Sequence, residues 1–153
     1  MITICKFEEE YYEELLLFLE KCLPESGRQL ELNGRHKIYC NISKTFDGFW
    51  CLFDEKNIIG TVALKKIDST KCELKSLYLL QKYHGKRWGY CLLKMAIRKA
   101  QEMGYREMYL DTLSTSTKAI RLYEEMGFAV TERYNTNEVA DLFMVLTFNR
   151  EKG

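Results

Sequence analysis

The stretch "YHGKRWGYCLLKMAIRKA", residues 83–100, decides the fold, because a basic segment containing two glycines runs directly into a helical pattern. Apolar residues recur there at the i, i+3 and i+4 spacing of a helix that packs one face on a core: Leu92, Leu93, Ala96, Ile97 and Ala100. Glycine is unfavourable inside a helix, so two of them at a helix start suggest a special backbone conformation or a close approach to a ligand.

A helix start of this kind predicts an anion site. The first N–H groups of a helix have no partner within the helix, and the helix dipole places partial positive charge beside them. Gly85 and Gly89 would let the backbone approach a phosphate, and Lys82, Lys86 and Arg87 add charge. The alternative is a glycine-tolerant helix cap on a solvated basic face.

Around this stretch, apolar periodicity and turn residues predict an alternation of strands and helices. Pro24 is expected to end the first helix, and Gly104 and Gly127 are expected to end two later ones. The segment 28–44 is ambiguous between short helices and a long loop. The predicted strands are 1–7, 48–54, 58–67, 71–80, 105–112, 128–134 and 140–148, and the predicted helices are 8–23, 86–103 and 116–126.

This order predicts an α/β fold: a central twisted, mixed sheet of about seven strands, flanked by helices on both faces. The β-α-β passages at 71–112 and 105–134 require parallel strands. A chain of 153 residues without a linker or repeat is expected to form a single domain over residues 1–153.

Composition narrows the possible partners. With 23 basic and 22 acidic residues the net charge is +1, which argues against bulk affinity for nucleic acid or an anionic membrane. No apolar run approaches the roughly 20 residues that span a bilayer. The first residues lack the basic and apolar regions of a signal peptide, so we expect a cytoplasmic protein.

The six cysteines do not indicate a metal site. They include no C-x-x-C pair and no accompanying pair of histidines, so we expect no metal. In the cytoplasm most of them should be small buried apolar residues rather than disulfides.

Two segments together resemble a known family. Leu77-Tyr78-Leu79, followed by the segment from Gln81 to Gly89, resembles the acetyl-CoA signature of the GNAT superfamily of N-acetyltransferases, a strand followed by Arg/Gln-x-x-Gly-x-Gly/Ala at a helix start. The segment from Ala119 to Phe128 resembles the family's A-x-x-x-Y-x-x-x-G-F helix end. The resemblance covers roughly residues 58–148. In the signature, His84 stands where Arg or Gln is usual, and Arg87 where the first glycine is usual.

The resemblance implies acetyl-CoA as co-substrate and a set of residues that bind it. Backbone groups of the strand would pair with the pantetheine arm, and the glycine-containing loop would hold the pyrophosphate. The implied cofactor-binding residues are Leu77, Tyr78, Leu79, His84, Gly85, Lys86, Arg87, Trp88, Gly89, Tyr90 and Ser116. An ordinary N-cap role at the start of the 117–126 helix is equally open for Ser116, and the two roles are compatible.

Acetyl transfer to an amine needs a base for the amine, a donor for the oxyanion and an acid for the leaving thiolate. By resemblance, Tyr123 is the general acid and Glu73 the general base, directly or through water. Asp111 is a second candidate acidic residue. The alternatives are that Tyr123 is ordinary core and that Glu73 faces solvent beside Lys71 or Lys75.

The resulting hypothesis is an acetyl-CoA-dependent N-acetyltransferase that acts on a primary amine of a small molecule, for example an amino acid or related metabolite, by direct attack in a ternary complex. Three alternatives stay open. The first is a non-catalytic CoA-binding sensor, which the departures at His84 and Arg87 allow. The second is a protein or peptide N-terminal acetyltransferase, and the third is a different protein that binds a phosphate ligand at the same helix start. The sequence leaves the choice between monomer and homodimer open.

Overall fold

The computed structural model describes residues 1–148. The strands form one seven-stranded sheet in the order β1-β2-β3-β4-β5-β7-β6. Neighbouring strands pair antiparallel in β1–β2, β2–β3, β5–β7 and β6–β7, and parallel in β4–β5, so the sheet is mixed, as expected. The strands are β1 Ile2–Lys6, β2 Gly48–Asp54, β3 Asn57–Lys66, β4 Lys71–Leu79, β5 Glu107–Thr112, β6 Ala129–Thr131 and β7 Leu142–Thr147.

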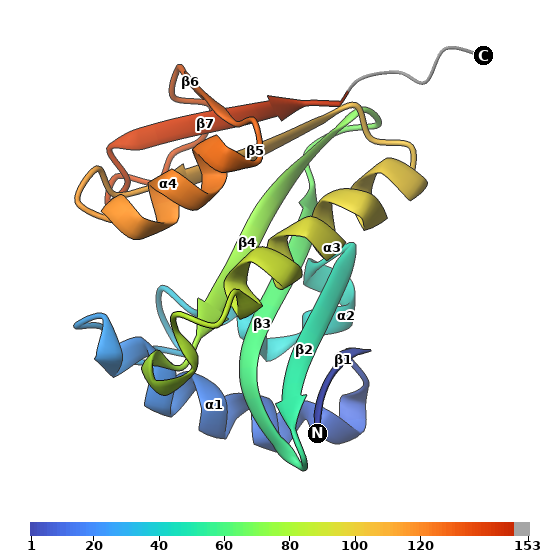
Figure 1. The fold of residues 1–153 in the computed structure, drawn as a ribbon, viewed down its shortest axis with the longest axis vertical. Helices are drawn as coiled ribbons and strands as arrows, with labels where there is room; N and C mark the ends of the chain where they lie inside the picture. The colour runs from blue at the N-terminus through green and yellow to red at the C-terminus, as the bar shows by residue number, and fades with distance from the viewer. Residues whose placement is uncertain (149–153) are drawn as a thin grey trace. The chain divides into compact units, whose positions relative to one another are not determined.

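Within residues 1–148, four α-helices and three short 3₁₀ helices connect these strands. Figure 1 shows how the chain runs through them. The chain forms two compact units. The first unit comprises Met1–Lys65 and Lys75–Leu93, and the second comprises Lys66–Leu74 and the chain from Lys94 onward. A single domain over residues 1–153 stays a prediction. The helices are η1 Glu9–Tyr11, α1 Tyr12–Glu25, η2 Lys37–Cys40, α2 Ile42–Thr45, η3 Gln81–Tyr83, α3 Trp88–Glu102 and α4 Thr117–Glu125.

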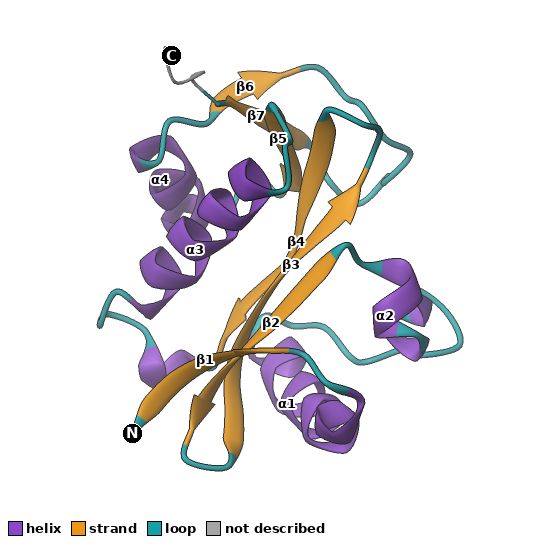
Figure 2. Ribbon diagram, turned by 90° about the vertical axis from the view of Figure 1, so that its right-hand side faces the viewer, coloured by secondary structure: helices purple, strands orange, loops and turns teal. Residues whose placement is uncertain are grey.

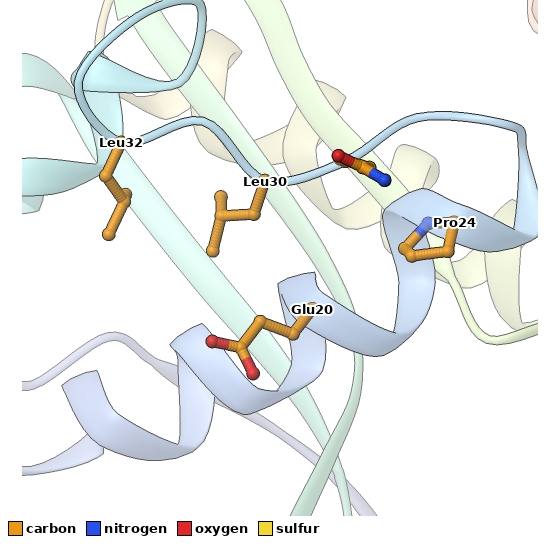
Figure 3. Close-up of a pocket in the computed structure, with 5 residues that line it drawn as sticks. Glu20, Pro24, Leu30 and Leu32 are labelled. Atoms are coloured by element: carbon orange, nitrogen blue, oxygen red, sulfur yellow. The ribbon is translucent and has the colours of Figure 1, made fainter.

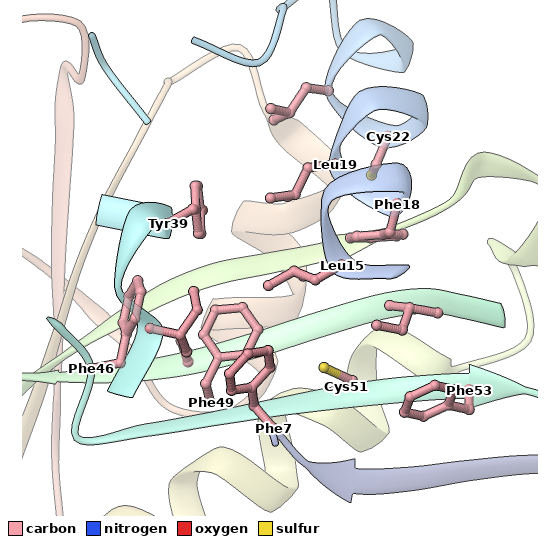
Figure 4. Packing of buried hydrophobic residues seen from close by; sticks show 14 residues of the cluster. Phe7, Leu15, Phe18, Leu19, Cys22, Tyr39, Phe46, Phe49, Cys51 and Phe53 are labelled. Carbon is pink, nitrogen blue, oxygen red and sulfur yellow. The ribbon is translucent and has the colours of Figure 1, made fainter. Parts of the chain in front are cut away.

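In the first unit, α1 and α2 lie on one face of β1–β3 (Figure 2). The α1 side chains Leu15, Phe18 and Leu19 are almost fully buried there. They pack with Phe49 and Cys51 of β2 in an aromatic-rich cluster (Figure 4). The amphipathic spacing of α1 thus covers this face of the sheet.

The opposite face of β2 and β3 is also buried, as the nearly continuous apolar run of β2 requires. Leu92 at the start of α3 approaches Gly60 of β3, where an added Cβ would lie 3.3 Å from Leu92 Cδ1 and 3.0 Å from the Tyr78 carbonyl oxygen. Gly60 therefore permits the close packing of β3, β4 and α3. Helices cover both faces of the strands in this unit, as predicted.

In the second unit, β5 pairs with β7 over six residues, and β6 pairs with the other side of β7. Because β5 and β6 are both antiparallel to β7, they run parallel to each other, with β7 between them. Gly127, with a φ of 103°, ends α4 in the left-handed conformation expected of a helix-ending glycine.

Several predicted boundaries are wrong. Pro24 lies inside α1, which continues to Glu25, and the turn at Gly27 (φ 80°) follows the helix. Proline removes one helical hydrogen bond and crowds the preceding turn, but here the helix ends one residue later, where the Ser26 amide bonds the Leu23 and Pro24 carbonyls. The strand expected at 128–134 ends at Thr131, which leaves Tyr134 in the connection to β7.

Candidate functional site

The predicted anion site is the loop at residues 81–90, which leads from η3 into the first turn of α3. Gly85 has a φ of 83° and Arg87 a φ of 67°, so both adopt the left-handed conformation that glycine reaches without strain. For an arginine this conformation costs roughly 1–2 kcal/mol. The backbone at residue 87 therefore has the conformation that favours glycine in the signature, although the side chain is different.

Side chains and backbone groups of the first unit anchor the 81–90 loop. The Glu25 Oε1 at the end of α1 accepts a hydrogen bond from the Gln81 amide at 2.8 Å. The Tyr83 hydroxyl donates to Asp54 Oδ2 in the β2–β3 hairpin at 2.5 Å. His84 Nε2 lies 2.9 Å from the Leu79 carbonyl oxygen and can donate to it. The loop is thus fixed by three contacts before any ligand is considered.

The loop presents cationic side chains and an uncovered backbone. Residues 84–87 are exposed, and no atom lies within 4 Å of the position that a Cβ on Gly85 would occupy. The Arg87 guanidinium lies over the Tyr90 ring at 4.2 Å. Trp88 and Gly89 begin α3 and are half-buried. The first amides of a helix have no partner within the helix, and together with the exposed Lys86 and Arg87 they fit a diphosphate group.

The three strand residues that were predicted to bind the cofactor lie at the end of β4. Leu77, Tyr78 and Leu79 are half-buried. The Tyr78 hydroxyl lies 3.5 Å from the Tyr39 hydroxyl, and the Arg28 guanidinium lies 5.8 Å from the centre of its ring. The Tyr78 side chain therefore lies among residues of the α1–η2 segment, and any cofactor contact at this residue falls to its backbone.

A buried polar network holds β4 just before these residues. Ser76 has a φ of 55°, unusual for a non-glycine strand residue. Its hydroxyl bonds the Tyr39 hydroxyl at 2.5 Å, and Thr61 Oγ1 donates to its carbonyl at 2.6 Å. Burial raises the pKa of Tyr39 well above its usual value, so the phenol stays protonated and able to donate. The network explains how the irregular backbone of β4 is stabilised.

Glu73 lies on β4 in the second unit and is 7% exposed, so the solvent-facing alternative is wrong. It pairs in register with Tyr109 of β5, at the last β4 position in the observed β4–β5 pairing. Its Oε2 accepts a hydrogen bond from the Tyr134 hydroxyl at 2.6 Å and another from Asn135 Nδ2 at 3.0 Å. A buried carboxylate with two donors on one oxygen is held in a defined position.

Asp111, the second candidate, is joined to Glu73 through Asn135. Asn135 Nδ2 donates to Asp111 Oδ2 at 2.6 Å as well as to Glu73. Burial, together with the negative charge of Glu73, raises the pKa of Tyr134 far above its usual value, which keeps this phenol a donor. We call Glu73, Asp111, Tyr134 and Asn135 the carboxylate cluster.

Tyr134 and Asn135 were not among the predicted site residues. No local sequence pattern links them to Glu73, because more than 60 residues separate them from it. The neighbouring Arg133 donates hydrogen bonds to the Asn137 carbonyl at 2.7 Å and the Ala140 carbonyl at 3.1 Å. It stabilises the connection between β6 and β7.

The remaining predicted residues lie on α4 and at its start. Tyr123 is 8% exposed, and its ring centre lies 5.8 Å from that of Phe128, so it belongs partly to the core. Ser116 occupies the N-cap position of α4 and is half-buried. Its side chain makes no capping hydrogen bond, so the capping alternative for Ser116 is wrong.

A surface hollow of about 350 Å³ lies between α1 and the segment that follows it (Figure 3). It contains none of the predicted site residues. Its wall combines apolar side chains with one carboxylate and one amide: Pro24, Leu30, Leu32, Glu20 and Gln29.

Within residues 1–148, no group of three or more His, Cys, Asp or Glu side chains is arranged to hold a metal ion. In the same part of the chain, none of the helices has the length and apolarity needed to cross a bilayer.

Comparison with known families and sequences gives a consistent result. The sequence model of the family described as "Acetyltransferase (GNAT) family" matches residues 8–128. An uncharacterised N-acetyltransferase of Schizosaccharomyces pombe is 39% identical over 71 residues, which are 46% of this chain and 44% of that protein. An uncharacterised N-acetyltransferase of Escherichia coli is 32% identical over 95 residues, 60% of this chain and 57% of that protein. The chain thus spans about half the length of the curated relatives it matches.

Solved structures share the fold over nearly the whole chain. An acetyltransferase from Streptococcus agalactiae superposes with a TM-score of 0.87 at 20% identity, covering 96% of this chain and 98% of that one. The PaiA N-acetyltransferase of Thermoplasma acidophilum, solved in complex with coenzyme A, superposes with a TM-score of 0.78 at 23% identity, covering 97% and 99%.

Proposed function

The chain belongs to the acetyltransferase (GNAT) family, and from this premise we propose that it transfers the acetyl group of acetyl-CoA to a primary amine of a small molecule. The observation that carries the proposal is the buried carboxylate of Glu73, held by Tyr134 and Asn135. An amine is protonated at neutral pH and must lose a proton before it can attack a thioester.

The 81–90 loop supports acetyl-CoA as the acetyl donor. Its left-handed residues, Gly85 and Arg87, expose backbone at the start of a 15-residue helix, and Lys86 adds positive charge. In the proposal this backbone binds the diphosphate of CoA. Arg87 replaces the glycine of the signature but keeps its left-handed backbone conformation, so the diphosphate-binding backbone is preserved. The same observation favours an enzyme over a sensor with a degraded signature.

In the proposed reaction Glu73 accepts a proton from the bound ammonium group and releases it to water. The free amine then attacks the thioester carbonyl carbon, an N–C bond forms, and the C–S bond breaks. Tyr123 gives its phenolic proton to the departing thiolate, and the second surplus proton of the nitrogen returns through water to the phenolate. No covalent enzyme intermediate is needed.

The carboxylate cluster supports a cationic acceptor. Glu73 and Asp111 lie on either side of one amide nitrogen, and they would attract an alkylammonium group more than a neutral one. We therefore propose a small aliphatic amine, such as an amino acid or a related metabolite, as the acceptor.

Release of free CoA thiol in the presence of a panel of aliphatic amines, amino acids and peptide N-termini tests the function. We expect turnover with at least one small aliphatic amine and a Tyr123→Phe variant with kcat lowered roughly tenfold or more. Calorimetric CoA binding without turnover on any amine would favour the sensor. Turnover confined to peptides would replace the small-molecule acceptor.

A further inference from the structure

Asn135 lies between two carboxylates, and every polar atom of its side chain is engaged. Nδ2 donates to Glu73 Oε2 at 3.0 Å and to Asp111 Oδ2 at 2.6 Å. Oδ1 accepts a hydrogen bond from the Asn137 backbone amide at 3.1 Å. The two carboxylates and the backbone N–H together fix which end of the amide is nitrogen, because only nitrogen can donate to both carboxylates.

We propose that Asn135 is a positioning residue for the reaction, and the proposal rests on the proposed function of Glu73 as base. Each amide hydrogen of Asn135 binds one carboxylate. The bridge therefore holds the Glu73 oxygen in place, and it keeps Glu73 and Asp111 apart as two separate hydrogen-bond acceptors.

The Asn135 bridge counteracts the repulsion between the neighbouring carboxylates of Glu73 and Asp111. Carboxylates that approach each other repel and tend to share one proton, and a shared proton would block removal of a proton from the amine. A donor placed between them stabilises the negative charge on both sides at once. Asn135 can do so without adding charge of its own, whereas a lysine at this position would compete with the ammonium group of the acceptor.

Other charged and titratable groups surround the same carboxylate and must be considered with it. They are Tyr134 of the β6–β7 connection, Asp111 and Tyr109 of β5, and, next along β4 itself, Lys71 and Lys75.

The connection between β6 and β7 has other supports, so Asn135 is not needed merely to attach it. Arg133 bonds two backbone carbonyls in the connection and lies over the Phe143 ring at 4.6 Å. The Tyr134 ring packs edge-on against the Phe143 ring, with the ring centres 5.7 Å apart. It also packs in a tilted arrangement against the Tyr109 ring, with the centres 5.0 Å apart.

Three variants separate positioning from folding. Asn135→Asp keeps the size of the side chain and an oxygen for the Asn137 amide, but replaces the donor with a third carboxylate. Asn135→Ala removes the bridge without adding charge. Asn137→Ala is the matched control, since its side chain accepts only from the Val139 amide in an exposed turn and its own backbone amide is retained.

We expect kcat to fall roughly tenfold in Asn135→Ala, the effect on the base of losing the hydrogen bond to the Glu73 carboxylate, and further in Asn135→Asp. The acid limb of the kcat/KM profile should move to higher pH in both, because the ionised carboxylates lose a donor. Asn137→Ala should change kcat by less than about threefold and leave the profile in place. The CoA dissociation constant should be unchanged in all three.

If Asn135→Ala keeps the wild-type pH profile and matches Asn137→Ala in kcat, the positioning role is overturned while the proposed function stands. If the wild type itself releases no CoA with any amine, the proposed function fails. The bridge is then tested without turnover by the side-chain amide proton resonances of Asn135. In NMR spectra, Glu73→Gln and Asp111→Asn should each shift the resonance of one of the two Asn135 side-chain amide protons. Unchanged resonances in both variants would overturn the bridge.

Discussion

The 81–90 loop and the carboxylate cluster make their sites in different ways. The loop offers backbone in left-handed conformations at Gly85 and Arg87, and its residues 84–87 are exposed. The cluster consists of side chains that bond one another, with Glu73 buried at its centre. A backbone site tolerates changes of side chain as long as the conformation persists, whereas a side-chain site is sensitive to each functional group. The two regions should therefore respond to substitution in separable ways.

The largest effect should come from Glu73→Gln. The amide has nearly the same shape but cannot accept the proton of the amine, so we expect kcat to fall roughly 100- to 10,000-fold. Isothermal titration calorimetry should give a CoA affinity close to that of the wild type. A variant that loses CoA binding together with turnover would show that the two regions are not separable.

Gly85→Val tests the backbone conformation of the 81–90 loop, the other of the two regions compared. The Cβ of the added side chain would meet no neighbouring atom within 4 Å, whereas the φ of 83° is unfavourable for valine, and we expect CoA to bind about tenfold more weakly. Gly27→Val is the matched control, with a φ of 80° and equally free surroundings in the turn after α1. The control should lose similar thermal stability and keep its CoA affinity.

Arg87→Gly tests whether the loop acts through its backbone. Glycine relieves the left-handed strain, and we expect the free energy of unfolding to rise by up to about 1 kcal/mol in urea titrations. CoA affinity should change by no more than a few-fold. Arg87→Ala, which keeps the strain and removes the guanidinium, completes the comparison. A large loss of affinity in both variants would assign the phosphate contact to the side chain.

The smallest effect concerns pH. The pKa of Tyr134 is raised in the folded chain, and that of an unfolded tyrosine is about 10, so the folded state retains the proton more strongly. The stability linked to this proton is complete below pH 10 and is lost as the pH rises above it. Urea unfolding between pH 8 and 11 should therefore show a shallower loss of stability in Tyr134→Phe than in the wild type. Equal slopes would mean that Tyr134 ionises normally.

Local patterns in the sequence were sufficient for most of the fold. The two strands of the β2–β3 hairpin and the glycines that end α3 and α4 follow from periodicity and turn chemistry. The end of α1 did not, because Pro24 indicates a stop without showing that the helix can include it in its last turn. The end of β6 was also missed, because the residues from 128 to 134 continue a strand-like pattern beyond the point where pairing with β7 stops.

The site was predictable where it depends on short motifs and not where it depends on distant contacts. The resemblance named Glu73, and the short basic motif named the loop, as candidates whose roles stay predictions; the structure adds that Glu73 is buried. Asn135 and Tyr134 meet Glu73 only because β7 is inserted beside β5, which brings the β6–β7 connection to it. The positive φ of Arg87 was equally hidden, since arginine gives no local sign of a left-handed conformation.

The three anchors of the 81–90 loop have a consequence for the kinetics of association. Glu25, Asp54 and the Leu79 carbonyl hold the loop when the chain folds, so its conformational entropy is already lost before a ligand arrives. A ligand that docks on such a loop does not have to order it, and more of the contact energy remains as affinity. Its capture should be a single bimolecular step whose observed rate rises linearly with ligand concentration, without the plateau of a slow rearrangement.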